Sequence, residues 1–98
     1  MAIRFEWDAA KARINLRKHG VAFEDAIAAF TDPFALTQQD RVEGGERRWQ
    51  TLGMAGGCLV LLVAHTVGEA DDGTEVIRII SARAADRKER KHYENQDR

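Results

Sequence analysis

The spacing of apolar residues near the N-terminus predicts two short helices. Asp8 suits the N-cap of the first, because its carboxylate can accept hydrogen bonds from the free amides of a first helical turn. Apolar residues then repeat at helical spacing as far as His19, and Gly20 can adopt the left-handed conformation that ends a helix. Spacings of four and three over residues 23–30 predict the second helix, which Asp32-Pro33 ends.

From Phe34 onward the apolar residues follow the two-residue period of β-strands. Ala55-Gly56-Gly57 has the composition of a hairpin turn, and residues 67–74 read as a longer polar turn. Consecutive strands on short turns pair antiparallel, so an antiparallel sheet of four to five strands is predicted. Its strands are expected around residues 34–36, 49–51, 59–63 and 76–80, with Ile3–Glu6 as an edge strand.

Asp86 and Glu89 have the three-residue spacing of a capping box, which predicts a last, basic helix that runs through Tyr93. The expected fold is therefore α+β. Two N-terminal helices precede the sheet and one helix follows it, in two packed layers that form a single domain over residues 1–98.

Composition narrows the class of protein. With 44% hydrophobic and 32% charged residues the chain is globular rather than disordered. Its longest apolar run, residues 58–64, is far shorter than the roughly 20 residues that span a bilayer, and residues 1–6 have no uninterrupted apolar stretch like that of a signal peptide. We therefore expect a cytoplasmic protein without membrane association. Cys58 lies in that run and reads as a small core residue rather than a nucleophile.

The net charge of −1 gives no general argument for nucleic-acid binding, so any such surface must be local. Five bases face two acids over residues 83–91, whereas residues 69–75 hold four acids and no base. The three histidines lack a metal-ligand spacing, and no glycine-rich phosphate loop is present. We expect neither a metal nor another cofactor.

An ordered set of short motifs resembles the BrnT family of toxins over nearly the whole chain. The motifs are FEWD at 5–8 with Lys11 and Asn15, KHGVAFEDA at 18–26, Asp32-Pro33, Glu46-Arg47, His65-Thr66, IRIISAR at 77–83, Glu89-Arg90 and Tyr93-Glu94. Each motif is too short to be specific alone. Their order, together with the size of the chain and the sequence of its elements, makes the resemblance strong.

This resemblance implies a RelE-like toxin fold and a metal-independent endoribonuclease that shuts down translation. It also implies a BrnA-like antitoxin with a ribbon-helix-helix part, which would contact operator DNA on behalf of the complex. The RNA substrate would be free or associated with the ribosome. Two toxins on an antitoxin dimer is the stoichiometry that the resemblance implies.

Cleavage of RNA without a metal needs a base for the ribose 2′-hydroxyl, cations for the phosphate and an acid for the leaving oxygen. Histidine, arginine, lysine, glutamate and tyrosine can supply these groups. The catalytic candidates are Arg78, Arg83, Glu46 and His65; the RNA-binding candidates are Thr66, Ser81, Arg47, Lys18, His19, Trp49 and Tyr93.

His65 and Thr66 end the most apolar predicted strand, where an imidazole can shuttle a proton and a hydroxyl can bind phosphate. His65 shares a face with Leu61 and Val63. The alternative is therefore a histidine at the edge of the core with a satisfied hydrogen bond.

Arg78 interrupts a run of branched residues and by strand parity points away from Ile77 and Ile79. It is either a phosphate clamp on a rigid strand or one half of an ion pair with Glu46 or a neighbouring carboxylate. Arg83 lies outside the last helix, and we expect it to be freer and equally suited to phosphate.

Glu46 and Arg47 begin a predicted strand in which Arg47 and Trp49 share a face. Glu46 is a candidate general base, with an ion pair to Arg48 or Arg78 as the alternative. Trp49 could stack a base, although a tryptophan on a strand of a small domain more often belongs to the core.

Lys18 and His19 close the first helix, where the helix dipole alone explains positive charge. They remain secondary candidates. Tyr93 and the bases of the last helix read first as a packed edge and a solvated face, and a role in an RNA groove is the minority hypothesis.

Two other functions stay open at this point. A toxin-shaped binding module could position an antitoxin on DNA with little or no catalysis. Direct DNA binding through the last helix is weaker, because Asp86, Glu89 and Glu94 interleave with its bases.

Overall fold

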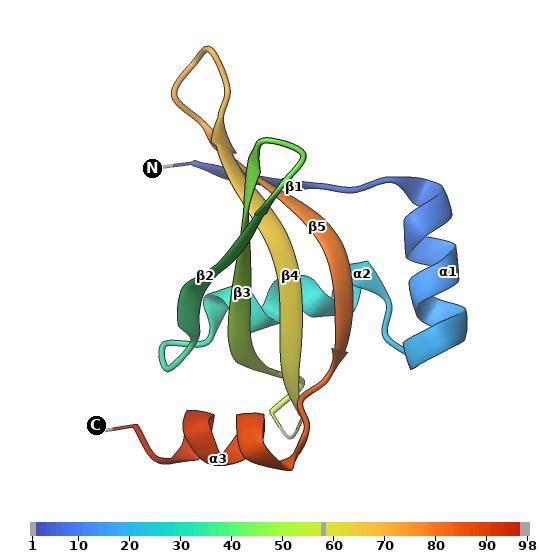
Figure 1. The fold of residues 1–98 in the computed structure, drawn as a ribbon, viewed down its shortest axis with the longest axis vertical. Coiled ribbons are helices and arrows are strands. Elements are labelled where there is room, and N and C mark those ends of the chain that lie inside the picture. The colour runs from blue at the N-terminus through green and yellow to red at the C-terminus, as the bar shows by residue number, and fades with distance from the viewer. Residues whose placement is uncertain (1, 58, 97–98) are drawn as a thin grey trace.

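A computed structural model describes residues 2–57 and 59–96 of the chain, so the prediction for Cys58 falls outside the described residues. The elements run in the order β1 (Ile3–Glu6), α1 (Ala9–His19), α2 (Phe23–Ala26), the 3₁₀ helix η1 (Ile27–Thr31), β2 (Leu36–Glu43), β3 (Glu46–Ala55), β4 (Leu59–Glu69), β5 (Glu75–Ala84) and α3 (Arg87–Glu94). The fold is α+β, as predicted (Figure 1).

Local capping signals place the helix ends. The Asp8 side chain accepts a hydrogen bond from the Lys11 amide, and Gly20 ends α1 at φ 70°. Asp86 and Glu89 form the predicted capping box at the start of α3. Each of these signals lies within a few residues of the helix end that it fixes, which is why the sequence predicts them well.

The second predicted helix forms and ends before Asp32, but only its first part is an α-helix. The chain is α-helical as far as Ala26 and tightens into η1 from Ile27. This segment packs backbone to backbone on β3, where a Cβ on Gly53 would lie 2.2 Å from the carbonyl oxygen of Ala29. The missing side chain of Gly53 therefore lets η1 lie directly on the sheet.

The prediction of a purely antiparallel sheet is wrong. The five strands have the order β1-β5-β4-β3-β2, and β1 runs parallel to β5. The segment from α1 to η1 carries the chain from one edge of the sheet to the other, so β2 forms beside β3 rather than beside β1 (Figure 1). Only the hairpins β2–β3, β3–β4 and β4–β5 follow the antiparallel rule.

The strands are longer than the apolar runs that predicted them. β4 continues to Glu69 and β5 begins at Glu75, so the turn predicted over 67–74 is confined to residues 70–74. His65 consequently lies inside a strand and does not end one. Ladder hydrogen bonds depend on the backbone, so pairing extends beyond the apolar side chains.

The sheet has two unlike faces. One, which we call the helix-side face, packs on α2 and η1 through a core that includes Phe23, Ala29, Val63 and Ile79. The other is covered only at one end, where Tyr93 of α3 packs in a smaller cluster. We call it the open face; its side chains include Leu36, Gln38, Glu43, Glu46, Arg48, Gln50, Leu52, Leu62, Ala64, Thr66, Arg78, Ser81 and Arg83. In the described residues, no helix has the length and apolar character needed to cross a membrane.

Candidate nucleic-acid interface

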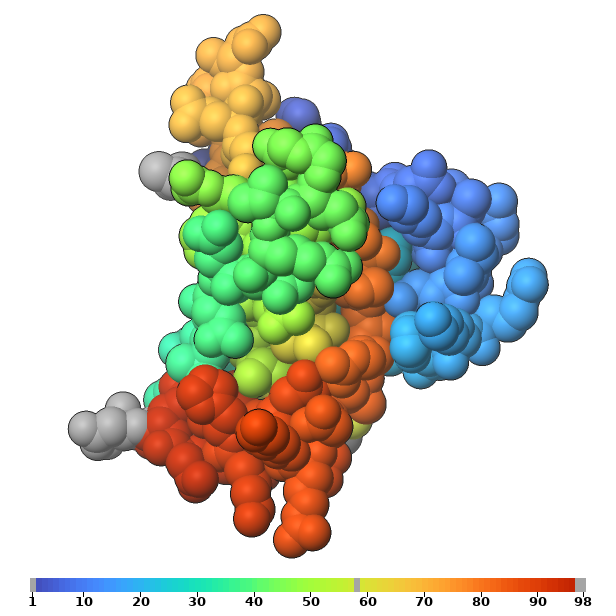
Figure 2. All heavy atoms as spheres, in the orientation of Figure 1, coloured from blue at the N-terminus to red at the C-terminus, as the bar shows by residue number. Residues whose placement is uncertain are grey.

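The open face is a broad surface with raised margins. In Figure 2 α3 closes one end of it and the β2–β3 hairpin the other, while β5 bounds one side and side chains of β3 and β4 lie between them. Such a surface can hold an extended ligand. The side chains that β3, β4 and β5 point to it decide what that ligand is.

Glu46 and Arg78 meet on this face. The Nη2 group of Arg78 donates a hydrogen bond to Oε1 of Glu46, although β4 lies between their two strands. Thr66, the register partner of Arg78, lies on the same face. The Glu46 and Arg78 side chains remain 48% and 39% exposed, so a ligand can reach both. The predicted orientation of Arg78 is confirmed, and so is the ion pair that was its structural alternative.

Arg48 adds a cation that the sequence analysis treated only as a partner for Glu46. Its Nη2 atom lies 3.0 Å from Oε2 of Glu43, and its side chain is 20% exposed. Over the parts of the chain that the structure describes, its buried Nε atom has no hydrogen-bond partner. Strand parity could have placed Arg48 beside Glu46, since the two residues are two apart on one strand.

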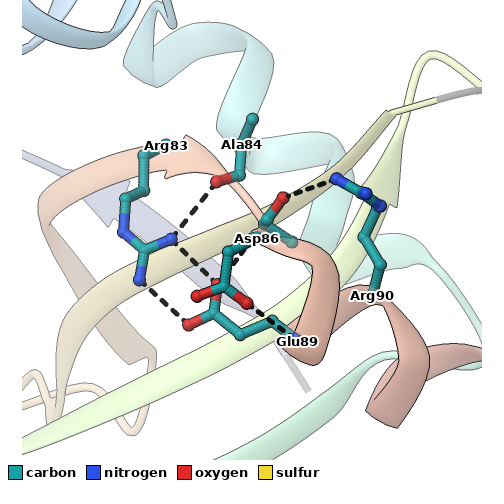
Figure 3. Close-up of polar contacts among 6 residues, drawn as sticks. Arg83, Ala84, Asp86, Glu89 and Arg90 are labelled. Atoms are coloured by element: carbon teal, nitrogen blue, oxygen red, sulfur yellow. Dashed lines mark hydrogen bonds and ion pairs between the residues drawn. The ribbon is translucent and has the colours of Figure 1, made fainter.

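Arg83 is not freer than Arg78, contrary to expectation. Its Nη1 and Nη2 atoms donate to the two carboxylate oxygens of Glu89 at 2.8 and 2.9 Å, and Nη1 also reaches the carbonyl of Ala84 (Figure 3). The paired charges raise the pKa of Arg83 and lower that of Glu89, chiefly through their hydrogen bonds. The ion pair between Arg83 and Glu89 therefore links the end of β5 to the start of α3.

His65 lies on the helix-side face and is buried, away from Glu46 and Arg78. Its Nε2 atom shares a 2.8 Å hydrogen bond with Thr51, whose hydroxyl lies 2.7 Å from that of Thr37. The ring also packs edge-on against Phe30. Burial lowers the pKa of His65 below 6.5, and a hydrogen bond to the Thr66 carbonyl partly opposes this. The arrangement is that of the satisfied histidine that the sequence allowed as the alternative.

Trp49 and Arg47 also point to the helix-side face. Trp49 is the register partner of His65 and is partly buried, whereas Arg47 is exposed near the β2–β3 hairpin. Glu46 of β3 and Arg78 of β5 point to the open face. The structure thus separates Trp49 and Arg47 from these two residues.

Lys18 and His19 lie at the margin of the sheet. With Ser81 and Ile80 they line a shallow depression between the end of α1 and β5. Both are exposed, and Ser81 belongs to the open face. The structure therefore brings three of the predicted RNA-binding residues together beside β5.

Tyr93 is buried and anchors α3. Its hydroxyl donates to the carboxylate of Asp32, which also accepts from the backbone amides of Met54 and Phe34. The Asp32-Pro33 motif thus has a structural role beyond ending a helix. The packed-edge interpretation of Tyr93 agrees with this geometry.

Within the described residues, no three His, Cys, Asp or Glu side chains gather where they could hold a metal ion. The chemistry on the open face rests on a carboxylate, guanidinium groups and hydroxyls. Those groups can bind phosphate and move a proton, which are the operations that RNA cleavage needs.

Comparison with solved structures supports the fold. The 1.1 Å crystal structure of the Brucella abortus ribonuclease toxin BrnT matches with a TM-score of 0.61, covering 88% of this chain and 100% of that chain at 22% sequence identity. No curated protein matches the chain. At this identity the structural likeness is evidence about the fold alone.

The sequence itself matches a family model. The model described as "Ribonuclease toxin, BrnT, of type II toxin-antitoxin system" covers residues 7–89. This range begins directly after β1 and includes all of α1 through β5 and both residues of the Arg83–Glu89 pair. The chain therefore belongs to the BrnT family of ribonuclease toxins of type II toxin–antitoxin systems.

Proposed function

We propose that this protein is a metal-independent endoribonuclease that cleaves RNA on the open face and thereby inhibits translation. The observation that carries the proposal is the exposed Glu46–Arg78 pair on a rigid sheet. Glu46 accepts the proton of the ribose 2′-hydroxyl, and Arg78 stabilises the charge that grows on the phosphate. The 2′-oxygen bonds to phosphorus as the bond from phosphorus to the 5′-oxygen breaks, and water protonates the leaving 5′-oxygen.

The pair can serve both purposes in one complex. A guanidinium has five N–H donors, and the bond from Arg78 to Glu46 uses one of them. The others can meet phosphate oxygens while Glu46 stays within reach. Lys18, His19 and Ser81 at the margin of this face contact the RNA backbone beyond the cleavage point. Thr66 lies beside Arg78 on the same face but is buried, so it does not reach the RNA.

Arg83 has a supporting role in this proposal, because its bonds to Glu89 and the Ala84 carbonyl use three of its five N–H donors. His65, Trp49 and Arg47 lie on the other face, and the reaction does not use them. The partner is a BrnA-like ribbon-helix-helix antitoxin, and the complex contacts operator DNA only through that antitoxin. The toxin acts in the cytoplasm, on RNA that is free or bound to ribosomes.

The test is cleavage of a defined single-stranded RNA in excess EDTA, free and with ribosomes added. We expect wild-type cleavage to survive chelation and to fall at least about 100-fold in Arg78→Ala and Glu46→Gln, since one electrostatic or proton-transfer group contributes a factor of about 10² or more. Arg13→Ala is the matched control, because Arg13 is exposed on α1. Loss of all wild-type cleavage in EDTA would refute metal independence.

A second function has an observation of its own. Three arginines of the open face pair with acids: Arg48 with Glu43, Arg78 with Glu46, and Arg83 with Glu89. This neutralised surface, in a chain of net charge −1, favours a toxin-shaped binding module without catalysis. Growth arrest on expression without the antitoxin, lost in Arg78→Ala, supports the ribonuclease; a folded and harmless wild-type protein that binds its antitoxin supports the module.

A further inference from the structure

We propose that the pocket between α3 and the open face binds one unpaired nucleobase of the RNA, and that Gln38 and Gln50 read its edge. The proposal rests on the proposed function, because it gives that RNA-binding face a sequence preference. The pocket holds about 190 Å³ and lies beside the end of the sheet that α3 covers. Its lining residues are Leu36, Gln38, Gln50, Leu52, Leu62, Lys88, Glu89 and His92.

The floor of the pocket is apolar and spans three strands. Leu36 of β2 pairs in register with Leu52 of β3, and Leu52 pairs with Leu62 of β4. Side chains that are paired in register point to the same face of a sheet, so the three leucines lie side by side. A nucleobase has flat apolar faces and binds against such surfaces when it is unstacked.

Two amides stand next to this floor. Gln38 and Gln50 are register partners on β2 and β3, two positions from Leu36 and Leu52 and therefore the next pair on the same face. Each amide offers both donors and an acceptor, the combination that the edges of the bases require. Along residues 2–57 and 59–96 the structure gives neither side chain a hydrogen-bond partner. A bound base would therefore add hydrogen bonds without breaking protein contacts.

The far wall of the pocket carries two groups that can bind phosphate, the Lys88 ammonium and the His92 imidazole. Lys88 and His92 are four residues apart on α3 and exposed, so they lie on one face of the helix. Glu89 stands between them, and its carboxylate already accepts from Arg83 and from the Asp86 amide. Its charge is therefore neutralised, and Lys88 and His92 can meet the phosphates that flank the base.

The pocket continues the proposed cleavage surface. Glu46, Arg48 and Gln50 alternate along β3 and point to the same face. Four residues of strand separate Gln50 from Glu46 by about 13 Å. The pocket thus holds a base near the cleavage point but not at it, which is the position of a specificity subsite.

A protein partner that inserts an apolar side chain is a different occupant of the same floor. That occupant would cover the leucines but leave Gln38 and Gln50 without partners, which carries a free-energy cost for buried amides. The two amides therefore favour a base. Binding of a protein at this floor in place of a base is therefore a result that would overturn the proposal.

Two measurements test the proposal. The first follows the side-chain amide resonances of the wild-type protein by NMR while AMP, GMP, CMP or UMP is added. We expect Gln38 and Gln50 to shift, and one nucleotide to act at a lower concentration than the rest. The second maps cleavage of a single-stranded RNA that contains every dinucleotide, by wild type, Gln38→Ala and Gln50→Ala.

We expect each glutamine variant to lower the preference for the favoured base about fivefold, the effect of one lost hydrogen bond, while cleavage elsewhere continues. Gln39→Ala is the matched control, because Gln39 is exposed and pairs with Trp49 on the helix-side face. Unchanged melting temperatures establish that the variants fold.

The outcomes separate the two proposals. Wild-type cleavage with a preference that both glutamine variants retain overturns the base pocket and leaves the ribonuclease intact. Nucleotide-induced shifts of Gln38 and Gln50 without any cleavage support the pocket and refute the ribonuclease. Shifts that only the antitoxin produces overturn the pocket in favour of a protein occupant.

Discussion

The side-chain amide of Asn15 pairs with the backbone of Ala82 as a neighbouring strand would. Its Oδ1 atom accepts from the Ala82 amide at 3.0 Å, and its Nδ2 atom donates to the Ala82 carbonyl at 2.8 Å. The ladder between β1 and β5 ends at Glu6 and Arg78, so Asn15 supplies the next hydrogen bonds along that edge. A second Nδ2 bond to the Val21 carbonyl joins the end of α1 to the same point.

We predict that Asn15→Ala lowers the free energy of unfolding by about 2–4 kcal/mol, because three buried backbone groups lose their partners. Urea denaturation at neutral pH measures the change. Arg13→Ala, an exposed substitution on the same helix, should stay within about 0.5 kcal/mol. Equal effects of the two substitutions would show that the edge of β5 does not depend on Asn15.

The close approach of η1 to β3 gives a second stability prediction. A Cβ at Gly53 would lie 2.2 Å from the Ala29 carbonyl oxygen, whereas at Gly68 the nearest atom would be 3.9 Å away. Gly53→Ala should therefore cost about 1–3 kcal/mol or more through overpacking, and Gly68→Ala should be nearly neutral. Thermal denaturation of both variants checks this; a Gly53→Ala protein as stable as Gly68→Ala contradicts the backbone contact.

The sequence predicts those parts of the fold whose causes are local. Asp8, Gly20 and the Asp86–Glu89 box act within a turn of the helix ends that they fix. The direction of β1 is different, because Ile3 pairs with Glu75, far along the chain. No local pattern carries that information, so the rule that consecutive strands pair antiparallel predicted a purely antiparallel sheet, whereas β1 is parallel to β5.

The same distinction applies to the candidate site. Strand parity placed Arg78 correctly, and an ion pair with Glu46 or a neighbouring carboxylate was the alternative to a phosphate clamp. Strand parity could not show that Glu89 serves both the capping box and Arg83, since the sequence alone assigns one carboxylate to one role. Gln38 and Gln50 gave no signal, because polar residues on both faces of β2 hide which face is open.

His65 makes stability depend on pH. Burial lowers its pKa below 6.5 in the folded protein, so the unfolded chain binds the proton more readily. Stability is therefore complete above about pH 6.5 and falls as the pH drops toward the folded pKa, by at most about 1.4 kcal/mol per pH unit. Urea denaturation at pH 7.5 and 5.5, where carboxylates remain ionised, measures the loss.

The matched variants for this prediction are His65→Gln and His92→Gln. The first should reduce the difference between the two pH values, because it removes the buried imidazole. The second should preserve that difference, since His92 is exposed on α3. A wild-type protein equally stable at both pH values would contradict the burial of a neutral His65.

The Arg83–Glu89 pair should behave as a structural unit. We predict that Arg83→Gln and Glu89→Gln each destabilise the protein, and that the double variant is destabilised less than the sum of the two. The expected coupling is about 1 kcal/mol, because the side chains are 37% and 24% exposed and solvent weakens their attraction. A double-mutant cycle in urea at neutral pH gives this quantity.

Acid should abolish the same coupling. Arg83 holds the pKa of Glu89 below its ordinary value of 4.5, so the stabilisation is present above pH 4.5 and disappears as the pH falls through the folded pKa.

RNA cleavage by the double variant Arg83→Gln, Glu89→Gln distinguishes two roles of Arg83, the positioning of α3 and direct contact with the phosphate. Restored cleavage relative to Arg83→Gln is expected if Arg83 only positions α3, whereas cleavage that stays low while stability recovers would assign Arg83 a direct contact with the phosphate.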